Sequence, residues 1–145
     1  MISVLQRCHN AKVTIDNQII GKIGKGLVSF LGIQKNDDKK KADILIEKTL
    51  NLRIFNDSNQ KMNLCIKDVN ASILVVSQFT LCADTKKGRR PSFLNAANPE
   101  DANILYQYFI NCLKNHGFHV ESGTFGATMD VQLINNGPAT FILNS

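Results

Sequence analysis

A chain of 145 residues, 43% of them hydrophobic, is long enough to bury a core of its own and too apolar to be disordered. No apolar run approaches the ~18 residues of a membrane span, and the N-terminus turns polar too early for a secretory signal. The net charge of +5 fits a polyanionic partner such as RNA about as well as it fits a generally basic surface. We therefore expect a single cytosolic domain over residues 1–145, with no membrane partner and with its four scattered cysteines reduced.

The first half of the chain predicts several strands around one helix. Strands are expected at residues 3–7, 12–15, 18–20, 27–33 and 52–55, the first two being parts of one strand. Asp16-Asn17 tolerates positive φ, which suits a tight hairpin. A helix is expected to begin at Asn36 or Asp37, either of which can cap it. Its buried face has five residues at helical spacing: Ala42, Leu45, Ile46, Thr49 and Leu50.

The second half predicts a well-signalled helix between strands. Strands are expected at residues 72–79, 118–121, 128–134 and 139–143, with a long polar loop at 82–95. Asn98 caps the helix, Pro99 fits its first turn and Gly117 ends it. Its expected buried stripe is Ile104, Leu105, Tyr108, Cys112 and Leu113. The order of elements predicts an α/β fold of the α+β type, with a mostly antiparallel sheet or small barrel and two main helices packed outside it.

Two patterns fit ordinary structural roles better than chemistry. The glycine-rich segment 21–26 does not match a dinucleotide fingerprint and precedes a strand, so a tight turn explains it better than a phosphate site. His116 and His119 are separated by Gly117, which should end the helix, and no third ligand is spaced to complete a metal site. We expect neither a metal nor another cofactor.

Polar residues end the apolar strand expected at 72–79. They are Ser77, Gln78 and Thr80, with Phe79 among them. Unpaired buried polar groups cost about 1–3 kcal/mol each, so these residues either cap a loop or form the rim of a pocket. At such a rim, backbone N–H groups can stabilise an oxyanion during attack on an ester carbonyl. Thr80 can serve as a nucleophile only with a base nearby, and none is visible in the segment.

Two further segments have both a structural and a functional interpretation. Gly137-Pro138 fits a β-turn between the last two strands, but Gly before Pro also reaches backbone angles closed to other residues, and an X-Pro bond can be cis. A cluster of four cations occupies a loop at Lys86, Lys87, Arg89 and Arg90. Such a cluster can hold phosphates or can simply be solvated.

Together these segments resemble the D-aminoacyl-tRNA deacylase family along essentially the whole chain. The matching segments are residues 50–55, 61–64, 77–81, 83–93, 125–129 and 136–140. Asn136 stands where this family often has Asp, and Ala139 where it often has Val, but Gly137-Pro138 between them is intact. Cys8 and Cys82 also depart from the residues expected at their positions.

The resemblance implies a homodimer that hydrolyses the ester bond of D-aminoacyl-tRNA, with its active sites at the subunit interface. Gly137-Pro138 would have a cis peptide bond and enter the partner's pocket, where two backbone carbonyls face the α-carbon of the aminoacyl group. An L side chain would collide with these carbonyls, whereas a D side chain would point to solvent. Glycine has no side chain to exclude, so glycyl-tRNA, such as that mischarged on tRNA(Ala), would also be cleaved.

The resemblance also implies roles for individual residues. Segment 77–80 would be catalytic, with N–H groups around Phe79 and Thr80 holding the carbonyl oxygen. Thr80 would act as the nucleophile or would orient the substrate, in which case the terminal ribose 2′-OH helps to activate water. The lack of a base in these motifs favours the second route. Phe125 and Met129 would line the pocket, and the four loop cations would contact tRNA.

Two rivals belong to other classes. The first is a non-catalytic tRNA-binding dimer that retains the scaffold, and the intact Gly137-Pro138 and 77–80 segments argue against it. The second is an unrelated esterase that uses Thr80 or Cys82 covalently. A trapped acyl-enzyme would favour that esterase.

Overall fold

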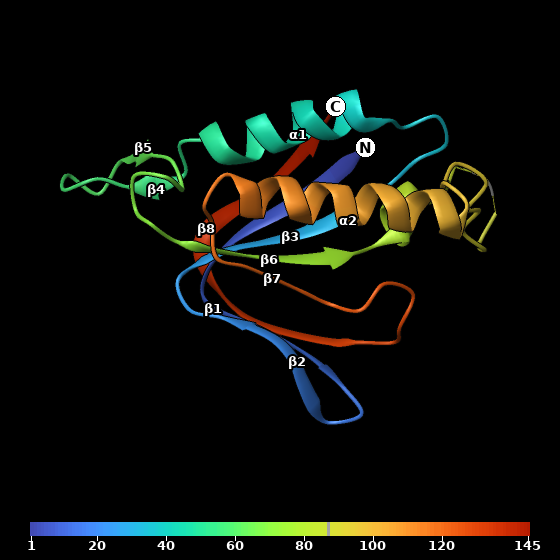
Figure 1. Ribbon diagram of the computed structural model, residues 1–145, viewed down its shortest axis with the longest axis horizontal. Helices are drawn as coiled ribbons and strands as arrows, with labels where there is room; N and C mark the ends of the chain where they lie inside the picture. Colours follow the sequence, from blue (N-terminus) through green and yellow to red (C-terminus); the bar gives the residue numbers. More distant parts are fainter. Residues whose placement is uncertain (87) are drawn as a thin grey trace.

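The computed structural model describes residues 1–86 and 88–145, and two α-helices lie across one face of its curved sheet (Figure 1). The main sheet contains β1 (Ile2–Ile15), β2 (Gln18–Ile23), β3 (Gly26–Gly32), β6 (Ser72–Ser77), β7 (Val120–Ser122) and β8 (Asp130–Asn144). The short strands β4 (Phe55–Asn56) and β5 (Met62–Leu64) pair separately. The helices are α1 (Lys39–Asn51), the 3₁₀-helix η1 (Phe79–Cys82) and α2 (Pro99–Asn115). Within the described residues, no helix is long and apolar enough to cross a membrane.

The sheet combines antiparallel and parallel pairs. β1 pairs antiparallel with β2, β3 and β8, whereas β6 pairs parallel with β3 and β7. Each parallel pair is joined through a helix, α1 between β3 and β6 and α2 between β6 and β7, because parallel neighbours need a long crossover. The predicted α+β fold, with two helices outside a mostly antiparallel sheet, is confirmed. The parallel pairs are the part that the hairpin-like spacing did not reveal.

Two apolar clusters lie on the two faces of the sheet. Successive residues of a strand point to opposite faces, so Leu27 and Ile73 join the cluster under the helices. Val28 and Leu74 join the second cluster, where partly buried side chains of β8 pack against them. Because both faces of β3 and β6 are covered, these strands are continuously apolar rather than alternating.

β8 is one long strand, whereas the sequence predicted two strands separated by a turn. The pairing register of β8 with β1 shifts between Gln6 and Cys8, so residues 136–139 stand opposite Arg7 alone. Gly137-Pro138 lies in this bulge, and its peptide bond is cis, as the resemblance implied. The expected turn is therefore wrong. Proline cannot donate to a β-ladder, and the strand accommodates it by bulging instead of reversing.

The start of α1 also differs from the prediction. Asp38 caps the helix, and its side chain accepts a hydrogen bond from the first turn. The caps predicted at Asn36 and Asp37 are wrong because Asn36 has a φ of +63° and the Asp37 carboxylate accepts the N–H of Gln34 instead. The five residues expected on the inner face of α1 are all buried.

The ends of α2 follow local signals. Asn98 accepts a bond from the first turn, and Gly117 adopts a φ of +87° after the last turn, so both predicted ends are confirmed. The strand predicted at 52–55 is wrong for most of its length. α1 continues to residue 51, and only Phe55 reaches a partner, Leu64 of β5.

The buried stripe of α2 matches the expected one only in part, since Leu105 and Leu113 are buried as predicted but the other three residues are not. Ile104 is 57% exposed, and Tyr108 and Cys112 are only half-buried. Tyr106 and Phe109 are fully buried in their place. The helix packs against both the sheet and α1, and these two large rings remove more apolar surface from water than the residues predicted from spacing alone.

Candidate active site

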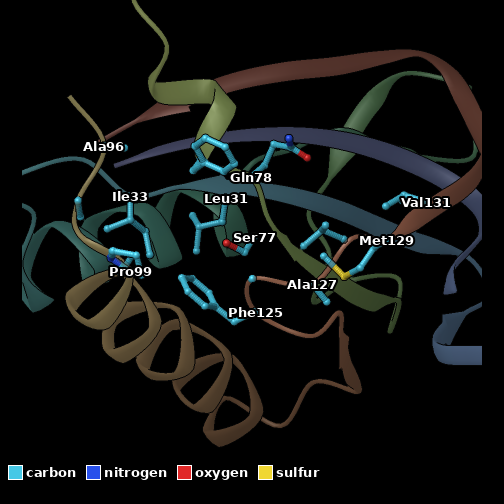
Figure 2. A pocket seen from close by; sticks show the side chains of 15 residues that line it. Leu31, Ile33, Ser77, Gln78, Ala96, Pro99, Phe125, Ala127, Met129 and Val131 are labelled. Carbon is cyan, nitrogen blue, oxygen red and sulfur yellow. The ribbon is translucent and has the colours of Figure 1, made fainter. Parts of the chain in front are cut away.

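A pocket of about 490 Å³ opens where the parallel strands β3 and β6 end (Figure 2). It lies at the carboxyl ends of these strands, the edge where ligands bind in many α/β folds. Figure 2 shows Leu31 and Ser77 at the strand ends, with Phe125 and Met129 on a facing segment. The lining residues are Leu31, Ile33, Val76, Ser77, Gln78, Phe79, Ala96, Ala97, Pro99, Ala102, Phe125, Gly126, Ala127, Met129 and Val131.

The lining of this pocket contains no ionisable side chain among the described residues. Its polar side chains are Ser77 and Gln78, and the rest of the wall is apolar. The described walls therefore offer neither a general base nor a general acid to a bound ligand. A reaction in this pocket would have to use backbone dipoles, water and groups of the ligand itself.

The rim of the pocket is built by the end of β6. Ser77 is the last paired residue, opposite Leu31, and the N–H of Gln78 donates to the Leu31 carbonyl at 2.8 Å. The chain then turns into η1, which leaves Phe79 and Thr80 exposed. The side-chain amide of Gln78 donates to the Thr80 hydroxyl at 2.5 Å. The hydroxyl of Thr80 is thus held by Gln78, and Thr80 is not among the residues that line the pocket.

Two backbone donors at this rim are left without a partner in the part of the chain that the structure describes. The N–H groups of Phe79 and Thr80 find no acceptor among the described residues, because the first N–H groups of a helical turn precede its ladder. Leu81, one residue later, already donates to the carbonyl of Gln78. Adjacent N–H groups of this kind can hold an oxygen that gains negative charge.

η1 is seated on Gly32 at the end of β3. A Cβ at Gly32 would stand 2.9 Å from the Cβ of Leu81 and 3.3 Å from the sulfur of Cys82. Any side chain there would push η1, and with it the two rim N–H groups, away from the sheet. The sequence around Gly32 gives no sign of this role, since the close approach of η1 arises from tertiary packing.

The facing wall is held by a buried tyrosine. The hydroxyl of Tyr106 lies 2.8 Å from the carbonyl oxygen of Val75 in β6 and 3.3 Å from that of Gly123. Burial raises the pKa of Tyr106 to about 12, so the hydroxyl stays protonated and donates. Its ring contacts that of Phe125, with centroids 5.7 Å apart. Tyr106 thus joins the strand that carries the rim to the segment that carries Phe125 and Met129.

Gly137 and Pro138 do not line the pocket of their own chain. They are exposed on the bulge of β8. The structure therefore brings Ser77, Gln78, Phe79, Phe125 and Met129 together at one pocket and leaves the Gly137-Pro138 segment apart from them.

The bulge of β8 is anchored by a buried arginine, Arg7, which is 4% exposed. Its Nε donates to the carbonyl of Asn136 at 3.0 Å, and its Nη2 lies 3.4 Å from the Asn136 side-chain oxygen. Nη1 donates to the carbonyl of Ile54 and, at 3.1 Å, to the side chain of Asn56. Desolvation lowers the pKa of Arg7, but a guanidinium remains charged at neutral pH. Arg7 thereby links Asn136, the residue before Gly137, to residues 54–56.

Three of the four predicted loop cations, Lys86, Arg89 and Arg90, are exposed on the loop that follows η1. The backbones of Asp84 and Ser92 bond to each other in both directions, at 2.7 and 2.9 Å, and close this loop at its base. Lys87 lies outside the described residues.

The thiol that a rival esterase would use is poorly suited to attack. Cys82 is buried, and its sulfur donates to the carbonyl of Ile33 at 3.4 Å. Burial raises the pKa of the Cys82 thiol, which lowers the fraction of nucleophilic thiolate. His119 contacts Ser72 and Glu121 on the surface. Residues 1–86 and 88–145 contain no cluster of three side chains suited to a metal ion.

Comparison with known proteins identifies the family of this chain. The profile of the family described as D-Tyr-tRNA(Tyr) deacylase matches residues 4–144. The D-aminoacyl-tRNA deacylase of Thermodesulfovibrio yellowstonii is 53% identical over 145 residues, which cover 100% of this chain and 99% of that protein. The one of Pseudoalteromonas translucida is 52% identical over 143 residues, which cover 99% of each chain. The solved structure of the c-Myc DNA Unwinding Element Binding Protein has a TM-score of 0.94 and 37% identity, covering 100% of this chain and 99% of that one. The chain therefore belongs to the D-Tyr-tRNA(Tyr) deacylase family of hydrolases.

Proposed function

We propose that this chain hydrolyses the ester bond of D-aminoacyl-tRNA and releases the free D-amino acid and tRNA. The observation that carries the proposal is the position of Ser77, Gln78 and Phe79 at the rim of an apolar pocket in a chain that matches the deacylase family from end to end. The aminoacyl group and the terminal adenosine enter this pocket. Residues 1–145 act as one domain, in the cytosol, where aminoacyl-tRNA is found.

The chemistry follows from the lack of an ionisable side chain in the pocket wall. The N–H groups of Phe79 and Thr80 hold the ester carbonyl oxygen, and water adds to the carbonyl carbon. The terminal ribose 2′-OH, which lies next to the ester, helps to orient and deprotonate this water. The bond from the carbonyl carbon to the ribose oxygen then breaks, and that oxygen takes the proton. Thr80 orients the substrate through its bond with Gln78 and forms no covalent intermediate.

Stereochemical selection comes from a second copy of the chain. In the proposed homodimer, Gly137 and Pro138 of one copy enter the pocket of the other, and their carbonyls occupy the space that an L side chain needs. Two features of the single chain support this arrangement. Gly137-Pro138 is exposed and apart from its own pocket, and β8 also exposes the large apolar side chains Ile134 and Ile142, which a second copy would cover. Glycyl-tRNA, including that mischarged on tRNA(Ala), passes this filter.

The test of the function is release of tyrosine from matched D-tyrosyl-tRNA and L-tyrosyl-tRNA by the purified protein in the presence of a chelator. We expect rapid hydrolysis of the D ester, with the L ester spared and the chelator without effect. If neither ester is hydrolysed, the protein would instead be a dimer that binds tRNA without catalysis. Equal hydrolysis of both esters would show that the enzyme does not reject L side chains, and the proposed stereochemical selection would be wrong.

Thr80→Ala separates the two routes of attack. We expect the rate with D-tyrosyl-tRNA to fall about tenfold, because one hydrogen bond that orients Gln78 is lost while the backbone N–H groups remain. Loss of a true nucleophile would instead cost about 10⁶-fold. Single-turnover hydrolysis measures the difference, with Thr85→Ala, at an exposed threonine of the next loop, as the control. A fall of many orders of magnitude with substrate binding preserved would restore Thr80 as the nucleophile.

A further inference from the structure

Two aromatic side chains, Phe79 and Phe93, lie exposed and in contact at the mouth of the pocket. Phe79 lines the pocket, yet 56% of its surface is exposed, and Phe93 is 39% exposed. Their ring centroids are 4.9 Å apart and the planes meet at 62°, an edge-to-face contact. Large aromatic side chains are usually buried, so an exposed pair beside a pocket is a candidate contact surface.

The backbone ties Phe93 both to the pocket and to the loop cations. The N–H of Ala96, a pocket residue, donates to the carbonyl of Phe93 at 3.0 Å, so this turn starts at Phe93 and ends in the pocket wall. On the other side, Phe93 directly follows Ser92, whose backbone pairs with Asp84 and closes the loop. One continuous path therefore runs from the pocket over Phe79 and Phe93 to the cationic loop.

The positive charge on this loop is not neutralised by nearby carboxylates. Within residues 1–86 and 88–145, no carboxylate forms an ion pair with Lys86, Arg89 or Arg90. The Asp84 carboxylate accepts the backbone N–H of Lys86 at 2.9 Å, which fixes the loop and leaves the cationic side chains to solvent. Positive charge that is not paired with a carboxylate attracts a polyanion to this surface.

We propose that Phe93, with the edge of Phe79, is a stacking platform for the unpaired nucleobase that precedes the terminal adenosine of tRNA. Lys86, Arg89 and Arg90 hold the phosphates on either side of that base. This proposal rests on the proposed function, which puts the terminal adenosine in the pocket. Aromatic faces beside cations are how proteins bind single-stranded nucleic acid without reading sequence, because every base has a face to stack. Such a platform suits an enzyme whose substrates all share the unpaired CCA end.

Binding of a fluorescent RNA trinucleotide, CCA, tests the platform without catalysis. We expect Phe93→Ala and Phe93→Leu to bind it about tenfold more weakly than the wild type, and Phe93→Tyr to bind as well, because only a ring can stack. Leu94→Ala serves as the matched control, since this neighbour is 76% exposed and has no ring. Equal binding by wild type and Phe93→Ala, or rescue by leucine, would overturn the proposal.

A second measurement compares hydrolysis of D-tyrosyl-tRNA with that of 3′-O-D-tyrosyl-adenosine, which lacks the preceding nucleotide. Phe93→Ala should raise the KM for the tRNA ester about tenfold and leave the KM for the adenosine ester unchanged. An equal loss with both esters would place Phe93 in the pocket itself. Dissociation of the Phe93→Ala protein into monomers on sedimentation would place it under a second copy. Either of these two results would overturn the proposed stacking platform. If the wild type hydrolyses neither ester but CCA binding still depends on the ring, the proposed function fails and the platform stands.

Discussion

Replacing Pro138 by alanine is expected to lower the preference for D- over L-tyrosyl-tRNA by about a hundredfold, the usual effect of misplacing an active-site group by about 1 Å. The proposed exclusion depends on the backbone carbonyls of Gly137 and Pro138 standing where an L side chain would lie. Proline fixes its own φ near −65°, and alanine releases this restraint. The ratio of kcat/KM values for the two esters measures the effect.

The same substitution at Pro91, also exposed but on the cationic loop, provides the control and should leave the D-to-L ratio unchanged. Pro138 is exposed in the single chain, so the stability of the fold should change by no more than about 0.5 kcal/mol. Continued rejection of the L ester by Pro138→Ala would remove this residue from stereochemical selection.

Arg7→Met is expected to lower the free energy of unfolding by about 2–4 kcal/mol. Methionine fills part of the volume but donates nothing, so the carbonyls of Ile54 and Asn136 lose their donors at about 1–3 kcal/mol each. The midpoint of urea unfolding should fall by about 1–2 M for a slope near 2 kcal/mol/M. Arg7 holds Asn136, the residue before Gly137, so its loss should also let Gly137-Pro138 shift. The fraction of the variant that remains folded should therefore discriminate less between D and L esters.

Arg53→Met is a matched control for this prediction. Arg53 contacts the backbone and side-chain oxygens of Asn63 much as Arg7 contacts those of Asn136, but it does so on the surface. The same substitution there should cost only about 0.5 kcal/mol, since water replaces the lost donor. Equal losses at the two positions would show that the anchoring of the bulge by Arg7 contributes nothing beyond a surface contact.

The parts of the fold that the sequence predicts are those specified by neighbours in the chain. The cap at Asn98, the stop at Gly117 and the hairpin at Asp16-Asn17 each depend on a few consecutive residues, and the structure contains all three. The wrong elements depend on distant partners. Residues 136–139 bulge because β1 continues past them with Arg7 as their only counterpart, and nothing near Gly137-Pro138 in the sequence distinguishes such a bulge from a turn.

The residues of the candidate site also fall into those that local sequence predicts and those that only tertiary packing reveals. Ser77, Gln78 and Thr80 stand out because polar residues at the end of an apolar strand need partners, and two of them reach the pocket lining. Gly32 and Tyr106 gave no such signal, since their roles arise only when η1 and α2 pack against the sheet.

Arg7 did give a signal in the sequence. It continues the alternation of Ser3 and Leu5, both buried on β1, so a charge at this inward position requires buried acceptors. The pattern does not say where those acceptors are, because Ile54 and Asn136 lie far along the chain.

In the proposed homodimer, one copy supplies the pocket and the other the stereochemical filter. A heterodimer purified through two affinity tags tests it, with one copy carrying Ala127→Trp to fill the pocket and the other carrying Pro138→Ala. Its single working pocket belongs to the Pro138→Ala copy and receives the intact Gly137-Pro138 of the other. We predict hydrolysis of D-tyrosyl-tRNA with the L ester spared, although neither homodimer behaves in this way. Hydrolysis of L-tyrosyl-tRNA by the heterodimer would mean that each pocket is filtered by its own chain, which contradicts a filter supplied by the partner.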